Sequence, residues 1–89
     1  MKIGKYREKY AWAHTMLREA FPDANIMDDV LEFGVGYVIA VLIGDDPNRV
    51  RYTIELEFPV GRKHFEASPE YLAKEIDRLS ESLKTVHWV

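Results

Sequence analysis

The sequence predicts a single α+β domain, a two-layer sandwich in which both helices lie on one face of a three-stranded antiparallel meander, in the order α-β-β-β-α. A fourth short strand is possible. Three observations predict this class: apolar residues at helical spacing near both ends, strict alternation of apolar and polar residues over 50–58, and turn-rich segments between. The 89 residues suffice for one core, so we expect one domain, 1–89.

The segment "IGKYREKYAWAHTMLREAFPDA" predicts the first helix. One face repeats apolar residues at helical spacing, and Pro22 closes the segment. The residues of that face are Tyr6, Tyr10, Ala13, Leu17 and Phe21.

Three strands follow, at 26–33, 37–43 and 50–58, and a fourth could form at Lys63 to Phe65. Gly34 to Gly36 predicts a tight hairpin loop. Closing both hairpins places Leu31 opposite Ile39 and Tyr37 opposite Leu56 on the core face. The second helix begins after Ser68, which has the chemistry of an N-cap before a proline.

The run "YVIAVLI" is too short to span a bilayer as a helix, so we expect no membrane partner. Half of the run faces the core, and Val38, Ala40 and Leu42 face outward. Charged neighbours could simply shield these apolar side chains. Alternatively, an apolar patch rimmed by charge is typical of a protein interface.

The first helix carries a second candidate surface. Trp12 and Met16 lie away from its apolar stripe and near lysines, as at many partner-binding surfaces. The competing interpretation is that Trp12 packs against the second helix.

A net charge of -3 supplies no general attraction to nucleic acid, so such binding would need a local basic patch. Arg49, Arg51, Arg62 and Lys63 are the candidates for phosphate contacts.

The predicted element order looks like that of the double-stranded-RNA-binding domain over nearly the whole chain. The resemblance implies duplex contacts from the first helix, the loop between the first two strands and a lysine-rich start of the second helix. Here that loop is "GVG", and "SPEYLAKE" has Glu70 and Glu75 around the single Lys74. The resemblance is therefore one of topology, and no residue's role carries over.

Signals for catalysis are weak. Glu55 and Glu57 are expected on the outer sheet face, and with His64 they would supply the acid-base groups of a small enzyme, given a concave pocket. His14, His64 and His87 have no metal-binding or nucleophile motif around them, and the chain has no cysteine. We expect no catalytic residue, no cofactor and no metal.

The sequence therefore favours a small non-enzymatic protein-protein interaction module in the cytoplasm, either an inhibitor or adaptor or a homodimer through the outer sheet face. Phage-encoded inhibitors and immunity proteins are analogues in size and charge alone. Nucleic-acid binding is the alternative function, and a small enzyme is the third.

Overall fold

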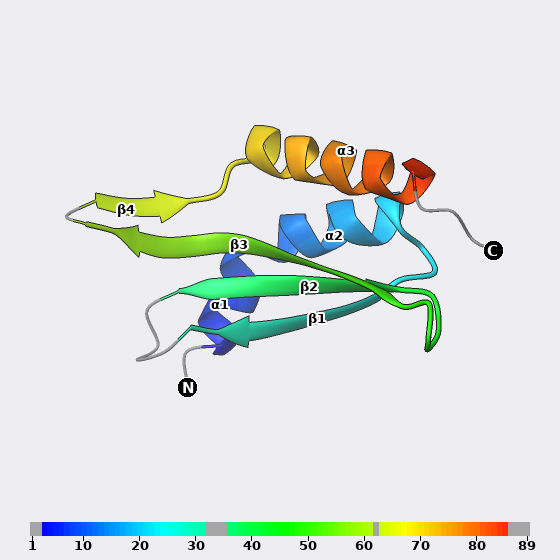
Figure 1. Cartoon of the computed structure of the whole chain (residues 1–89). Helices are drawn as coiled ribbons and strands as arrows, with labels where there is room; N and C mark the ends of the chain where they lie inside the picture. Colours follow the sequence, from blue (N-terminus) through cyan, green and yellow to red (C-terminus); the bar gives the residue numbers. More distant parts are fainter. Residues whose placement is uncertain (1–2, 32–35, 62, 86–89) are drawn as a thin grey trace.

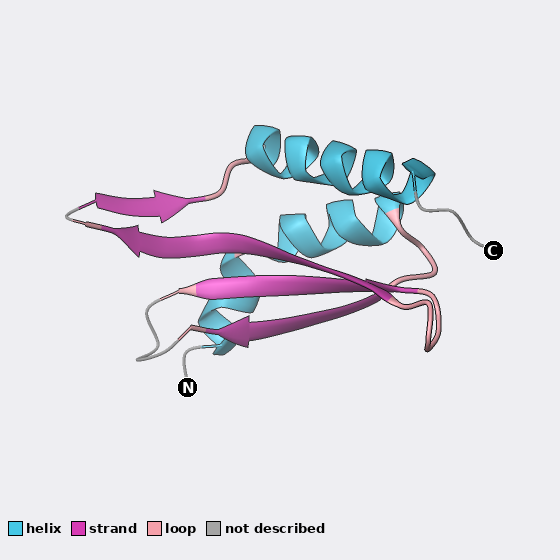
Figure 2. Cartoon of the chain, viewed as in Figure 1, coloured by secondary structure: helices cyan, strands magenta, loops and turns pink. Residues whose placement is uncertain are grey.

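The computed structural model describes residues 3–31, 36–61 and 63–85, and it confirms the predicted α+β class with an antiparallel meander (Figure 1). The strands lie in the order β1-β2-β3-β4, so each pairs with its neighbour in the chain (Figure 2). The fourth strand forms where a short one was expected. The elements are α1 (Ile3–Lys9), α2 (Ala11–Ala20), β1 (Asn25–Val30), β2 (Tyr37–Ile43), β3 (Val50–Val60), β4 (Lys63–Glu66) and α3 (Pro69–Thr85).

The predicted first helix is broken in two at Tyr10, which has φ -109° and ψ 25°. The Tyr10 ring is buried, and its hydroxyl donates to Glu57 Oε1 at 2.8 Å on the facing strand. Neither glycine nor proline stands here, so these contacts with the sheet offer a tertiary reason for the break. The rings of Tyr6 and Tyr10 both stack on Tyr37, with centroids 5.2 and 5.7 Å away.

The first hairpin differs from its prediction. β1 ends at Val30, opposite Tyr37, so the connection spans residues 31–36 and not three residues. Asp28 therefore stands opposite Ile39, where Leu31 was expected. This displacement by an odd number of residues exchanges the faces of β1, because side chains alternate along a strand. The expected loop residues 34 and 35 lie outside the described part of the chain.

The second hairpin confirms the predicted register from Ile43↔Val50 through Ile39↔Ile54. It departs at the far end, where Tyr37 pairs with Glu57 and not with Leu56. The register shift between Tyr37 and Val38 is a β-bulge.

α3 begins as predicted. The Ser68 hydroxyl accepts a hydrogen bond from the Tyr71 backbone N–H at 3.2 Å, which is the N-cap interaction. Leu72 and Leu79 on its apolar stripe are buried. No helix in the three described ranges has the length and apolar character needed to cross a membrane.

The core lies between one sheet face and the helices. It takes Tyr10, Ala13 and Leu17 from the N-terminal helical segment, Tyr37, Ile39, Val41, Ile54 and Leu56 from the sheet, and Ala67, Leu72 and Leu79 from the C-terminal region. None of the described helices lies over the opposite face of the sheet, which leaves it as a candidate binding surface (Figure 1).

Candidate functional site

The bulge in β3 turns Glu57 toward the helices. Val38 pairs with Glu55 and Tyr37 pairs with Glu57, so Leu56 is the extra residue between two ladder positions. Leu56 and Glu57 are consecutive, yet they are 0% and 6% exposed. The expectation that Glu57 lies beside Glu55 on the outer face is therefore wrong.

Glu57 on β3 is the centre of an ion cluster that also includes residues of α1, the α1–α2 junction and β4. It accepts hydrogen bonds from Lys9 Nζ at 2.7 Å, the Tyr10 hydroxyl at 2.8 Å and His64 Nε2 at 2.9 Å. Burial opposes its ionisation, but the hydrogen bonds from Lys9, His64 and Tyr10 outweigh burial and hold its pKa below the usual value. The cluster links α1 and the start of α2 to β3 and β4.

The same cluster contains a potential set of metal ligands. Ligand atoms of Glu57, His64 and Glu66 lie within 4.8 Å of one another. However, the Lys9 ammonium already lies 2.7 Å from Glu57 and 3.2 Å from Glu66, where it offsets one of their two negative charges. A cation would have to displace Lys9, so we interpret the group as a structural ion cluster.

A second polar cluster lies on the helix-facing side of β1. The Asp28 carboxylate accepts hydrogen bonds from Nε and Nη2 of Arg7 at 2.7 and 2.8 Å, and a third from the Tyr37 hydroxyl at 2.6 Å. His14 Nε2 lies 2.8 Å from the same hydroxyl. The hydrogen bonds from Arg7, together with one from Tyr37, hold the pKa of Asp28 at about 2.

This arrangement fixes the protonation of His14. The Tyr37 hydroxyl gives its one hydrogen to Asp28, so its oxygen must accept from His14 Nε2–H. Burial lowers the pKa of His14. The charge of Asp28 acts in the opposite direction, but the charges of Arg18 and Arg7 lower the pKa too, so the net shift is downward. His14 is therefore neutral at pH 7, with the lone pair on Nδ1.

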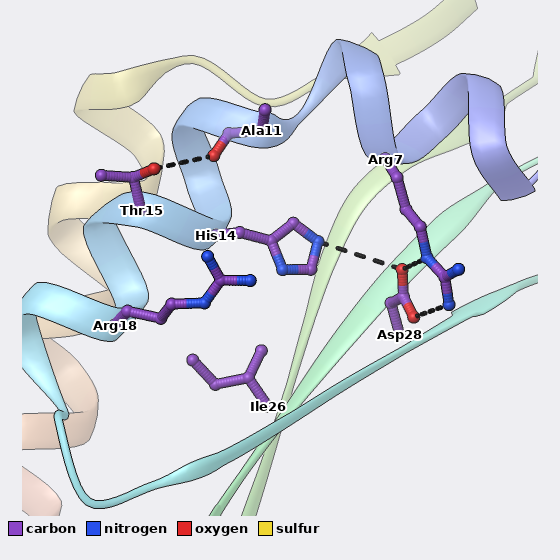
Figure 3. A pocket seen from close by; sticks show the side chains of 7 residues that line it. All are labelled: Arg7, Ala11, His14, Thr15, Arg18, Ile26 and Asp28. Carbon is purple, nitrogen blue, oxygen red and sulfur yellow. Dashed lines mark hydrogen bonds and ion pairs between the residues drawn. The ribbon is translucent and has the colours of Figure 1, made fainter.

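Beside this cluster lies a cleft of about 390 Å³ between the helices and β1 (Figure 3). Its polar side chains come from Arg7, His14, Thr15, Arg18 and Asp28, and Ala11 and Ile26 complete the lining. A concave pocket is the condition that we set for the enzyme alternative, but none of the predicted acid-base residues lines this cleft. Glu55 is exposed on the outer sheet face, and His64 is engaged with Glu57.

The outer sheet face forms a grid of three rows across β1, β2 and β3. The rows are Asn25, Leu42 and Arg51, then Met27, Ala40 and Thr53, then Asp29, Val38 and Glu55. A groove of about 210 Å³ runs through it, lined among others by Met27, Val38, Ala40 and Leu42. Met27 is 56% exposed, a large apolar side chain in open solvent. The grid therefore brings together three predicted interface residues, and the altered register adds Met27.

Trp12 and Met16 lie elsewhere. Both are half-buried and pack against the core cluster. At about 100° per residue they occupy the flank of α2 opposite to His14 and Arg18. This partial burial favours the packing interpretation of Trp12.

The three basic candidates that the structure describes do not form one patch. Arg49 and Arg51 are exposed near the start of β3, and Lys63 opens β4 beyond the other end of β3. At about 3.3 Å per residue, β3 separates Arg51 from Lys63 by roughly 30 Å. Arg62 lies outside the described residues.

Sequence reasoning missed the cluster of Asp28, Tyr37 and His14. His14 had no motif around it, and Tyr37 was assigned to the core as an apolar residue. The one available signal was Asp28, a carboxylate inside a predicted strand, but the predicted register placed it on the outer face.

No family model, curated protein or solved structure matches this chain.

Proposed function

We propose that this chain is a small non-enzymatic protein-binding module that pairs with a second copy of itself through the outer sheet face. The observation that carries the proposal is the grid of three rows, whose middle is apolar and whose two ends have opposite charge. Arg51 stands at one end, and Asp29 and Glu55 stand at the other.

This charge pattern is complementary to itself under a two-fold rotation. If the axis lies in the interface and runs across the strands, the row of Arg51 faces the row of Glu55 in the second copy. Arg51 then meets Glu55 twice, once on each side of the axis. Leu42 meets Val38 in the same way, and Ala40 meets its own counterpart.

Within one chain the same charges are too far apart to pair. Arg51 and Glu55 are four positions apart along β3, which corresponds to about 13 Å. Neither side chain has a hydrogen bond or ion pair within the described ranges. Both are exposed, so they are available to a second sheet at the packing distance of about 10 Å.

The size of the grid predicts the strength of the pairing. It covers about 15 Å across the strands and about 17 Å along them, so each copy would bury a few hundred Å². Stable interfaces bury about 800 Å² on each partner. We therefore expect a weak dimer whose population rises with protein concentration and whose two copies dissociate readily. A cytoplasmic setting belongs to the same proposal.

The test is sedimentation equilibrium over a concentration series from about 10 μM to 1 mM, which brackets the expected weak affinity. Leu42→Glu should give a monomer, because it places a charge in the middle of the paired faces. Arg51→Glu and Glu55→Arg should each weaken association, and the double variant should restore it. Arg49→Glu makes the same charge change outside the grid and should leave association unchanged.

Thermal unfolding of each variant shows whether the fold is retained. A wild-type chain that stays monomeric at the highest concentration would overturn pairing with a second copy. Association that persists in Leu42→Glu would show that another surface is responsible.

A further inference from the structure

We propose that the cleft between α2 and β1 binds a small molecule through an oxyanion group, a carboxylate or a phosphate, with Arg18 and His14 as the contacting side chains. The cleft lies on the helix-bearing side of the sheet, so this binding is independent of pairing through the outer face. Figure 3 shows both side chains directed into the cleft from α2.

The charges around the cleft favour an anion. Arg7 and Asp28 form a bidentate ion pair with N–O distances of 2.7 and 2.8 Å, so their charges largely cancel. Arg18 is exposed and has no hydrogen bond or ion pair with any residue in the described part of the chain. The lining therefore carries one uncompensated positive charge, on a guanidinium whose planar fork matches a carboxylate or phosphate.

His14 adds a ring nitrogen to the cleft that can act as an acceptor or, after protonation, as a donor to the ligand. Nε2–H is committed to the Tyr37 oxygen at 2.8 Å, so Nδ1 is the ring nitrogen left for a ligand. In the neutral ring Nδ1 is an acceptor, and after protonation it donates. An anion in the cleft stabilises the protonated ring, so anion affinity should rise as the pH falls.

The groups that act on His14 come from every neighbouring element. Arg7 on α1 and Arg18 on α2 oppose its protonation, and Asp28 on β1 favours it at 3.9 Å. Tyr37 on β2 contacts it without charge, because the pKa of its phenol is raised by burial and by Asp28. A bound anion would offset the two arginines, so that the protonated ring becomes accessible near neutral pH.

The size and the remaining lining narrow the ligand class. A volume of about 390 Å³ is at the lower end of the range for small-molecule sites. Ile26 and Ala11 supply apolar surface next to the polar groups. The cleft thus suits a compact oxyanion with an apolar part, such as an aromatic carboxylate or phosphate monoester, better than a bare inorganic ion.

The test is an NMR titration of the full chain with benzoate, phenyl phosphate and inorganic phosphate as probes. We expect backbone and side-chain shifts confined to α2 and β1, with a Kd of roughly 1 mM or tighter for at least one aromatic probe. Preference for benzoate or for phenyl phosphate identifies the oxyanion. Inorganic phosphate should bind more weakly than phenyl phosphate, because it leaves the apolar lining unused.

Two variants and a control assign the contacts. Arg18→Gln should weaken binding about tenfold or more, as for the loss of a charge-assisted hydrogen bond. Arg49→Gln removes the same charge from the β2–β3 turn and should leave the Kd unchanged. Benzoate should bind several-fold more tightly near pH 6 than near pH 8, and His14→Gln should abolish that difference.

The proposal is overturned if no probe shifts the signals of α2 and β1 at about 10 mM, tenfold above the expected Kd. It is also overturned if Arg49→Gln and Arg18→Gln weaken binding equally, since binding would then reflect net charge alone. Neither result depends on the oligomeric state, which is measured separately.

Discussion

The Asp28→Asn variant tests the polar cluster beneath α1 and α2. In the wild-type chain, two hydrogen bonds from Arg7 and one from Tyr37 lower the pKa of the Asp28 carboxyl group from 3.8 to about 2. At about 1.4 kcal/mol for each pH unit, this difference corresponds to about 2.5 kcal/mol of folding free energy before solvent screening. The Asp28 side chain is 9% exposed but Arg7 is 57% exposed, so solvent screening reduces the expected contribution to about 1–2 kcal/mol.

The sign of the pH dependence follows from the lowered pKa. Asp28 stabilises the fold fully above its ordinary pKa of 3.8, where the unfolded chain is also ionised. The stabilisation disappears as the pH falls toward about 2, where the folded chain takes up the proton. Asn keeps an acceptor for Tyr37 but cannot pair with the charge of Arg7, so wild type and variant should converge in acid.

The assay is urea unfolding at pH 7, at about pH 4 and at about pH 2.5, followed by circular dichroism. The matched control is Asp77→Asn, since Asp77 is exposed on α3 and makes no ion pair with any described residue. A gap between wild type and Asp28→Asn that stays constant across this range would refute the reasoning. So would a gap at pH 7 no larger than that of the control.

Three further substitutions test how the fold is held, each read from urea unfolding at pH 7. Glu57→Gln should cost about 1–2 kcal/mol, because the buried carboxylate loses its charge-assisted hydrogen bonds while the 40% exposure of Lys9 screens the lost ion pair; a loss below that range would contradict the role of the cluster. Ser68→Ala should cost about 1 kcal/mol by removing the N-cap acceptor of Tyr71, and an unchanged midpoint would argue against the cap. Gly36→Ala should cost more than about 1 kcal/mol, because φ is 149° and the new Cβ would clash with the Leu31 side chain and lie 2.9 Å from the backbone oxygen of Glu57; a neutral result would show that the backbone here accepts a Cβ without strain.

Much of the fold could be predicted because its signals are local. The alternation in β3 arises within one segment, and the structure confirms it from Val50 to Leu56, up to the bulge. The cap and stripe of α3 are also local, and the structure confirms both. The short connection after Ile43 fixed the register of the second hairpin up to Ile39↔Ile54. The outer positions of Val38, Ala40 and Leu42 follow from that register.

The first hairpin shows why register is harder to predict. Two glycines suggested a tight loop, but the connection spans residues 31–36. The resulting odd displacement moved Asp28 to the helix side and Met27 to the outer face. The polar cluster with His14 and Tyr37 depends on that displacement, so sequence spacing alone could not predict it.

The sequence by itself determined the fold class, the element order, the central part of β2 and β3 with their register, and the apolar residues in the middle of the outer face. Only the tertiary structure decided where the N-terminal helix breaks, which way Glu57 faces and what Asp28 contacts. The physical reason is that helix spacing and strand alternation are repeated within a segment. A bulge, a loop length or a hydrogen bond from Tyr10 to Glu57 depends on partners that are distant in the chain.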